Sequence, residues 1–216
     1  MQIMFENRQD AGRQLAEALK RYRDDNPVIL AIPRGGIIPG VIAALKLEAE
    51  FSVIITRKLG LPSHPESAFG ALAEDKSLYL DPMVREVLSK ELIEKVIVRE
   101  EKEIRRRIQL YRNGDPLPVL TGRTVILVDD GIVTGSTVMV AIELCKKQKA
   151  KKIVVAAPVS GKPILEKLKT KADEVVILDV PEEYYAVSQA YRKFSNLSDN
   201  EVLRWLQKAM FTQKSR

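Results

Sequence analysis

The chain has 216 residues, of which 45% are hydrophobic and 30% are charged, and its formal net charge is +6. This length suits one substantial core rather than two, and no stretch approaches the roughly 20 apolar residues of a membrane-spanning helix. We therefore predict a single cytoplasmic domain over residues 1–216 with no membrane partner; the positive charge suits an anionic partner of any class.

A helix, and then a unit of strand, loop and helix, are predicted at the start of the chain. Residues 10–22 carry apolar side chains at helical spacing behind Asp10, a candidate N-cap. The β-rich run PVILAIP, residues 27–33, precedes a glycine turn and an apolar segment, residues 37–47, with Pro39 near its start. This order indicates a strand that leads into a helix through a glycine loop.

Further aliphatic runs predict four more strands. They are EFSVIITRKLG (residues 50–60), TGRTVILVDD (121–130), KKIVVAAPV (151–159) and DEVVIL (173–178). Uninterrupted aliphatic strands that alternate with helices are typical of a mostly parallel sheet covered on both faces. We therefore predict a doubly wound α/β fold with its core at about residues 28–178. The single cysteine, Cys145, lies in an apolar helical run and is expected in that core.

A long helix interrupts the alternation, within an insertion at about residues 83–113. An apolar stripe runs along residues 89–111, and Asn113 with Gly114 marks the end of the helix. The cluster Arg105–Arg107 has the charge to grip nucleic acid. Because glutamates are interleaved with these arginines, a solvated helix face held by ion pairs is the favoured interpretation.

A segment that follows the second predicted strand has the character of a cover. Residues 57–82 are rich in proline and glycine, and we predict a flexible loop with a short hairpin that acts as a movable lid. His64 in this loop is a candidate proton shuttle, but a solvent-exposed histidine is the simpler interpretation.

A small C-terminal hood is predicted at about residues 181–216. Residues 198–201, SDNE, form a capping box at the start of a terminal helix. The aromatic side chains of the hood either stack on a planar base or pack under this helix; they are Tyr184, Tyr185, Tyr191 and Phe194.

The segment VILVDDGIVTGSTV, residues 125–138, places two acids and a hydroxyl-rich turn at the end of a strand. In an open parallel sheet, ligands bind beyond the carboxyl ends of the strands. The turn leads into a helix N-terminus, which suits a phosphate, although the lysine-containing phosphate loop of nucleotide-binding proteins is absent. Asp129 and Asp130 suit sugar hydroxyls or a magnesium ion. The residues therefore indicate a sugar phosphate.

This segment resembles the signature of the type I phosphoribosyltransferases. IPRGG, residues 32–36, resembles the pyrophosphate loop of that family, and TRKLG, residues 56–60, resembles the start of its catalytic loop. The resemblance covers about residues 28–178. It implies transfer of the phosphoribosyl group from 5-phosphoribosyl 1-pyrophosphate (PRPP) to a nitrogenous base, with pyrophosphate released and Mg²⁺ as cofactor.

The resemblance also implies roles for individual residues. Asp129 and Asp130 would hold the ribose hydroxyls and, directly or indirectly, Mg²⁺, while Arg34, Lys58 and Arg57 would stabilise the leaving diphosphate. The implied catalytic residues are these five. The implied PRPP-binding residues are Arg34, Gly35, Gly36, Lys58, Asp129, Asp130, Gly131, Val133, Thr134, Gly135, Ser136 and Thr137.

Two residues depart from the family pattern. Val133 stands where the hypoxanthine and guanine enzymes carry an acid that accepts a proton from the purine. An aliphatic side chain cannot accept a proton, so a 6-oxopurine substrate is disfavoured. Gly131 stands where an aliphatic residue is usual, and a looser turn is expected.

Two other functions fit parts of the sequence. A PRPP-sensing regulator that binds nucleic acid without transferase activity would suit the basic charge, but no nucleic-acid module precedes the core. A signalling receiver domain also carries acid pairs in a doubly wound sheet, but the hydroxyl-rich turn counts against it. The acceptor base stays open, as does assembly into a homo-oligomer.

Overall fold

A computed structural model describes residues 4–61, 68–81 and 88–214. Its main sheet has five parallel strands in the order β2-β1-β6-β7-β8. They are β1 (Val28–Ala31), β2 (Glu50–Val53), β6 (Thr124–Val128), β7 (Lys152–Val159) and β8 (Glu174–Asp179). The predicted parallel α/β fold is therefore confirmed. The strand order reverses between β1 and β6, which is the place where such sheets bind ligands.

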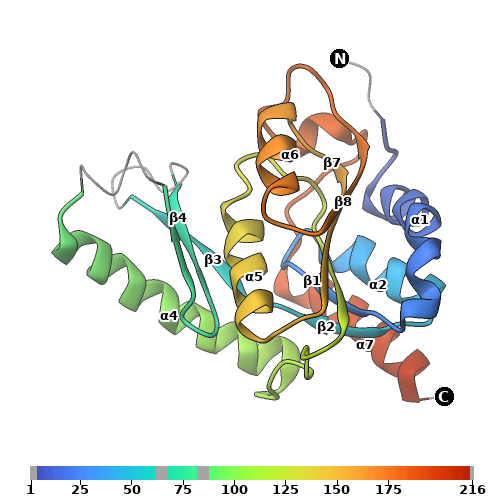
Figure 1. Ribbon diagram of the computed structural model, residues 1–216, viewed down its shortest axis with the longest axis horizontal. Helices are drawn as coiled ribbons and strands as arrows, with labels where there is room; N and C mark the ends of the chain where they lie inside the picture. Colours follow the sequence, from blue (N-terminus) through green and yellow to red (C-terminus); the bar gives the residue numbers. More distant parts are fainter. Residues whose placement is uncertain (1–3, 62–67, 82–87, 215–216) are drawn as a thin grey trace.

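Helices cover both faces of the main sheet (Figure 1). α1 (Arg8–Leu19) and α2 (Ile37–Leu47) pack on the face that carries Ile29, Ile126 and Val154. α5 (Ser136–Lys147) and α6 (Lys162–Lys169) lie on the opposite face. Successive residues of a strand point to opposite faces, so an unbroken aliphatic strand supplies a core on each side.

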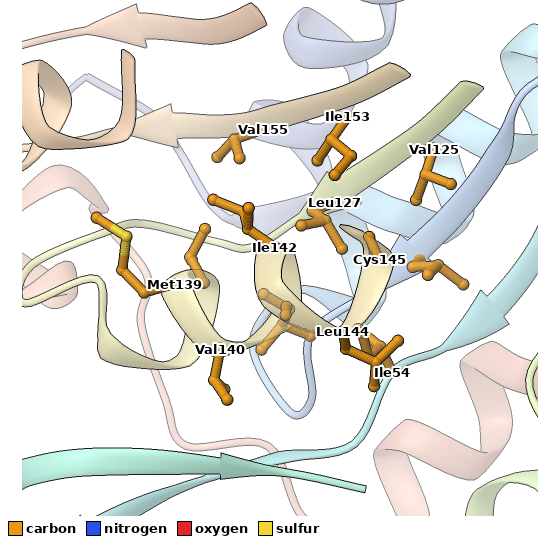
Figure 2. Close-up of a cluster of buried hydrophobic side chains, with 14 of the residues drawn as sticks. Ile54, Val125, Leu127, Met139, Val140, Ile142, Leu144, Cys145, Ile153 and Val155 are labelled. Carbon is orange, nitrogen blue, oxygen red and sulfur yellow. The ribbon is translucent and has the colours of Figure 1, made fainter. Parts of the chain in front are cut away.

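The core under α5 is the larger of these two layers. Figure 2 shows side chains of α5, among them Ile142 and Cys145, facing Leu127 of β6 and Val155 of β7. Each fully buried Leu, Ile or Val side chain stabilises the fold by about 1.5–3 kcal/mol. This packing holds the first residue of α5 close to the end of β6, where the hydroxyl-rich turn connects them.

A second, three-stranded antiparallel sheet has the order β3-β4-β5. It consists of β3 (Thr56–Gly60), β4 (Ala68–Ala73) and β5 (Leu78–Leu80). The prediction of one strand over residues 50–60 was wrong, because β2 and β3 belong to different sheets. The backbone N–H of Ile54 donates to Ala31 of the main sheet, and that of Ile55 donates to the Glu74 side chain. Both isoleucines are buried, so hydropathy does not reveal where the chain changes sheets.

The predicted insertion helix is α4 (Lys90–Arg112). The Ser89 side chain accepts a hydrogen bond from the Leu92 N–H, and Asn113 ends the helix in the left-handed conformation, with φ 53°. Val96 and Ile104 pack against β3 and β4. We call α4 with β3, β4 and β5 the arm, which extends beside the main sheet (Figure 1).

The two ends of the described chain form the remaining elements. Asn7 is the N-cap of α1 rather than Asp10, which lies in the first turn, so the predicted start of this helix was wrong. The helix is followed by the 3-10 turn η1 (Lys20–Asp25), and β8 by η2 (Val187–Ala190) and α7 (Asp199–Lys214). The predicted capping box is confirmed, since Ser198 N–H donates to Glu201 and Glu201 N–H donates to Ser198 Oγ.

None of the described helices has the length and apolar character needed to cross a lipid bilayer. α7 packs on α2 instead, through Val202 and Leu206. The C-terminal segment therefore continues the hydrophobic core on that side of the sheet.

The packing of Cys145 predicts its reactivity. Its side chain is buried, as expected from the sequence, and burial raises the pKa of the thiol to about 12. Because the thiolate is the reactive form, an aromatic disulfide reagent at neutral pH should modify the thiol only after denaturant unfolds the chain. Rapid modification of the folded protein would contradict this packing.

Candidate functional site

A cavity of about 460 Å³ lies beyond the carboxyl ends of β1 and β6 and extends to the arm. The predicted site residues line it, except Gly36 and Ser136. The lining residues that the sequence did not predict include Thr56, Arg99, Glu100, Arg107 and Val187. The structure thus brings the three separate motifs of the sequence together at one place.

The turn after β6 has the geometry of an anion site. Gly135 precedes α5 in the left-handed conformation, with φ 71°, and no side chain among the described residues caps the helix. The first N–H groups of a helix have no partner within the helix, and the helix dipole favours an anion there. The turn is anchored at its start because the Ile132 N–H donates to Val159 O at 2.9 Å.

Glycine is required in the loop after β1 because this loop packs directly on the end of β6. A Cβ atom at Gly35 would lie 2.2 Å from Asp130 Oδ2, and one at Gly36 would lie 2.4 Å from Val128 O. Gly36 therefore serves close packing at the start of α2, not the wall of the cavity. The peptide bond between Pro33 and Arg34 is cis.

The two aspartates have different environments. Asp129 is partly exposed in the cavity, and its Oδ1 accepts the Asp130 N–H at 2.9 Å. Although the residue is partly exposed, desolvation of its carboxyl group and the neighbouring charge of Asp130 raise the pKa of Asp129, and Lys58 opposes this rise. A low-dielectric site strengthens the repulsion between two carboxylates, so nearby cations stabilise their ionised form.

Asp130 forms a buried ion pair with Arg8 at the start of α1. Arg8 Nε donates to Asp130 Oδ2 at 2.6 Å, and the two side chains are 8% and 9% exposed. Arg8 Nη1 also donates to Ser195 O at 2.8 Å, and its guanidinium carbon lies 4.1 Å from the Phe194 ring centroid. Tyr191 Oη donates to the backbone O of Asp130 at 2.6 Å.

Sequence reasoning missed Arg8. Its partner lies 122 residues further along the chain. The available signal was its position in line with Ala11 and Leu15 on the buried face of α1. A cation on such a face needs a buried partner.

The three predicted cations line the cavity from the loop after β1 and from strand β3. Arg34 lies after β1, with Nη1 3.8 Å from Asp199 Oδ1. Lys58 and Arg57 both belong to β3. Arg57 Nε donates to Glu100 Oε2 at 2.8 Å, whereas Lys58 makes no ion pair with any residue that the structure describes.

The hood aromatics pack rather than line the cavity. Tyr184 and Tyr191 are buried, Tyr185 is 74% exposed, and Phe194 lies under Arg8. None of the four lines the main cavity in the described part of the chain, so stacking on a base is not supported. Tyr184, Tyr191 and Phe194 do not pack under the terminal helix either. They form a cluster with Phe5, Ala11 and Val159.

Tyr184 explains the unusual glycine of the turn. A Cβ atom at Gly131 would lie 2.5 Å from Tyr184 Oη and 2.9 Å from Val187 Cγ1. The expectation of a looser turn was therefore wrong, because these side chains occupy the space that an aliphatic residue would take.

The arginine cluster of α4 divides between two surroundings. Arg105 and Arg106 are exposed and pair with Glu101 and Glu103, as the solvated-face interpretation predicts. Arg107 is buried and lines the cavity. His64 lies outside the described residues.

The buried ion pair predicts a stability effect. Arg8→Met should reduce the free energy of unfolding by about 3–5 kcal/mol, because it leaves the Asp130 charge buried without its partner. The double variant Arg8→Met, Asp130→Asn should recover part of this loss. Denaturant unfolding measures both, with Arg13→Met as control, since Arg13 is 64% exposed in the same helix. Equal stability of the Arg8 and Arg13 variants would show that the buried pair contributes little.

Comparisons with known proteins agree on the family. Residues 4–194 match the phosphoribosyl transferase domain model. The Mycobacterium tuberculosis protein named "Putative phosphoribosyl transferase Rv0571c" is 39% identical in an alignment of 208 residues that covers 95% of this chain and 47% of that protein. The chain therefore spans about half the length of this relative.

Solved structures show the same fold. The crystal structure of TT1426 from Thermus thermophilus shares 36% identity and a TM-score of 0.79, covering 95% of this chain and 98% of its own. The AQ2163 protein from Aquifex aeolicus, at 15% identity and TM-score 0.52 over 85% of each chain, is similar in fold alone. The match of residues 4–194, together with the acid pair and turn after β6, shows that this chain belongs to the phosphoribosyl transferase domain family.

Proposed function

We propose that this site transfers the 5-phosphoribosyl group from PRPP to a nitrogenous base and releases pyrophosphate. One observation carries the proposal: a single cavity joins a carboxylate pair, an uncapped helix N-terminus and the cations Arg34 and Lys58. These groups are complementary to the three parts of PRPP, which are ribose hydroxyls, a terminal phosphate and a diphosphate. Membership of the phosphoribosyl transferase domain family supports the same assignment.

Each part of PRPP has a proposed partner in the cavity. The turn from Gly131 to Thr137 binds the 5-phosphate through backbone N–H groups and the hydroxyls of Thr134 and Thr137. Asp129 accepts hydrogen bonds from the ribose hydroxyls. Arg34 and Lys58 bind the diphosphate, and Asp130, held by Arg8, acts beside Asp129. Ser136 is buried at the first position of α5 and contributes its backbone N–H.

The donor set suits Mg²⁺ bound together with PRPP. Mg²⁺ prefers oxygen ligands and is commonly bound by one or two carboxylates plus substrate phosphates and water. Asp129 is partly exposed in the cavity, and the described residues contain no cluster of three or more metal-ligating side chains. We therefore infer that Asp129 holds the ion and that Asp130 contributes through its charge. When bound, Mg²⁺ would neutralise charge on the diphosphate.

The proposed reaction is a displacement at the anomeric carbon of ribose. The lone pair of a base nitrogen forms the new bond to that carbon, the bond to the diphosphate oxygen breaks, and pyrophosphate leaves with the electron pair. Where the attacking nitrogen bears a hydrogen, its proton passes to solvent. Positive charge grows on the ribose ring as the bond to oxygen weakens. Asp129, which lines the same cavity as Arg34 and Lys58, would stabilise that charge, and the two cations would stabilise the departing anion.

The residues that line the cavity also limit which base can accept the phosphoribosyl group. Val133 and Val187 line it beside Gly131. The acids among the described lining residues are Glu100, Asp129 and Asp130, and two of these are held by arginines. We therefore expect acceptors that need no protein acid at the Val133 position, which disfavours hypoxanthine and guanine.

The test is a product assay with PRPP, Mg²⁺ and a panel of purines, pyrimidines and nicotinate-like acids, read by mass spectrometry. Asp129→Asn and Lys58→Ala should each lower kcat by about 10²–10³, the usual effect of losing one preorganised charge contact. Asp24→Asn is the control, because Asp24 is exposed in η1. The midpoint of denaturant unfolding should be the same for each variant as for the wild type. A loss of kcat is then an effect on catalysis and not on folding.

Two outcomes would contradict the proposal. Full turnover by the Asp129 and Lys58 variants would remove the assigned roles. Saturable PRPP binding with no product from any base would replace transfer by sensing, and duplex binding that weakens steeply with salt would then be the next measurement.

A further inference from the structure

Three arginines form one wall of the cavity, where the arm meets the main sheet. Arg57 comes from β3, and Arg99 and Arg107 come from α4. Each is fixed through its Nε atom: Arg57 and Arg99 donate to Glu100 at 2.8 Å, and Arg107 donates to Glu103 at 2.7 Å. We call Arg57, Arg99 and Arg107 the arginine wall.

The terminal nitrogens of the arginine wall are available to a ligand. A guanidinium group carries five N–H donors, and the contact at Nε uses only one of them. The Nη atoms of these three arginines form no hydrogen bond with any residue that the structure describes. Fixing Nε orients the planar group while its Nη atoms stay free, which is the arrangement for bidentate binding of phosphate oxygens.

Glu100 is the centre of this arrangement. It is 4% exposed and accepts from two arginines at once, one on each side of the contact between β3 and α4. A buried carboxylate is costly unless it is paired, so both arginines are held close to it. Glu100 therefore fixes the distance between Arg57 and Arg99.

The buried face of α4 contains charged as well as apolar residues. The buried residues of α4 are Val96, Glu100, Ile104, Arg107, Tyr111 and Arg112. Three of them are charged, and Arg112 pairs with Glu74 and does not line the cavity. Glu100 and Arg107 do line it. Arg107 therefore adds positive charge to the wall of the cavity, and Glu100 holds the neighbouring arginines.

A hydroxyl on β3 supports a ligand at the same wall independently. Thr56 is 2% exposed and lines the cavity, and its Oγ1 has no hydrogen-bond partner among the described residues. A buried hydroxyl without a partner is unfavourable by about 1–3 kcal/mol. An oxyanion that reaches this oxygen would accept a hydrogen bond from the Thr56 hydroxyl.

We propose that α4 supplies Arg99 and Arg107 to the diphosphate subsite, where the arginine wall binds the diphosphate of PRPP and the released pyrophosphate. Glu100 is a positioning residue that acts through Arg57 and Arg99. The assignment of PRPP rests on the proposed function, whereas affinity for a diphosphate anion rests on the arginine wall alone. The insertion thereby becomes part of the binding site rather than an added surface helix.

The experiment measures binding by titration calorimetry with three probes in Mg²⁺: inorganic pyrophosphate, PRPP and ribose 5-phosphate. Arg107→Met should lower the affinity for pyrophosphate and for PRPP about tenfold or more. Arg99→Met should lower these affinities less, because Arg99 is more exposed. Ribose 5-phosphate lacks the diphosphate, so its affinity should not change. A variant that distorts the whole site would instead lower the affinity for all three probes.

Matched variants sharpen the test. Arg105→Met removes an exposed arginine of the same helix and should leave all three affinities unchanged. Arg107→Lys keeps the charge but not the planar fork, so it should restore only part of the affinity. Glu100→Gln weakens the hold on Arg57 and Arg99, and it should raise the KM for PRPP more than it lowers kcat.

The outcomes separate this inference from the proposed function. PRPP binding that is unaffected in the Arg99 and Arg107 variants would overturn the role of α4 and leave the transferase proposal standing. Pyrophosphate binding that depends on these arginines, without PRPP binding, would support the subsite and remove PRPP as the substrate. A wild-type protein that binds neither probe would overturn both.

Discussion

The contact between the loop after β1 and the end of β6 is the constraint on which the site depends. Gly35 lies so close to the Asp130 carboxylate that no side chain fits between them. This contact exists because β1 and β6 are neighbours at the reversal of the strand order. The loop that carries Arg34 and the turn that carries Asp129 therefore face one cavity, although about a hundred residues separate them.

Charge pairing determines which site residues are free to bind a ligand. Asp130 and Arg57 are each held by a buried partner, Arg8 and Glu100 respectively, so their positions are fixed before a ligand binds. Asp129 and Lys58 keep open sides toward the cavity. Some charges of the site are thus held in place by protein partners, and others are open to the ligand. Such a site is preorganised, because little rearrangement accompanies binding.

The sequence predicted the sheet and the central motif because their signals are local. The aliphatic runs of β1, β6, β7 and β8 and the acid pair after Val128 are read directly from neighbouring residues. The misses arise from contacts distant in sequence. Arg8 finds Asp130 and Gly131 makes room for Tyr184 only in the folded chain, and buried isoleucines hide the change of sheet after Val53.

The insertion helix shows how a charge pattern misleads when only its overall composition is considered. Interleaved acids and arginines indicate a solvated face, and Arg105 and Arg106 occupy one. Arg107 is next along the chain, yet it lies on the buried stripe, because adjacent helical residues point in directions about 100° apart. Position on the helix face, rather than the density of charge, therefore separates Arg107 from its neighbours Arg105 and Arg106. Glu100 follows the same logic, since an acid on a buried stripe beside a cationic cavity serves to fix its neighbours.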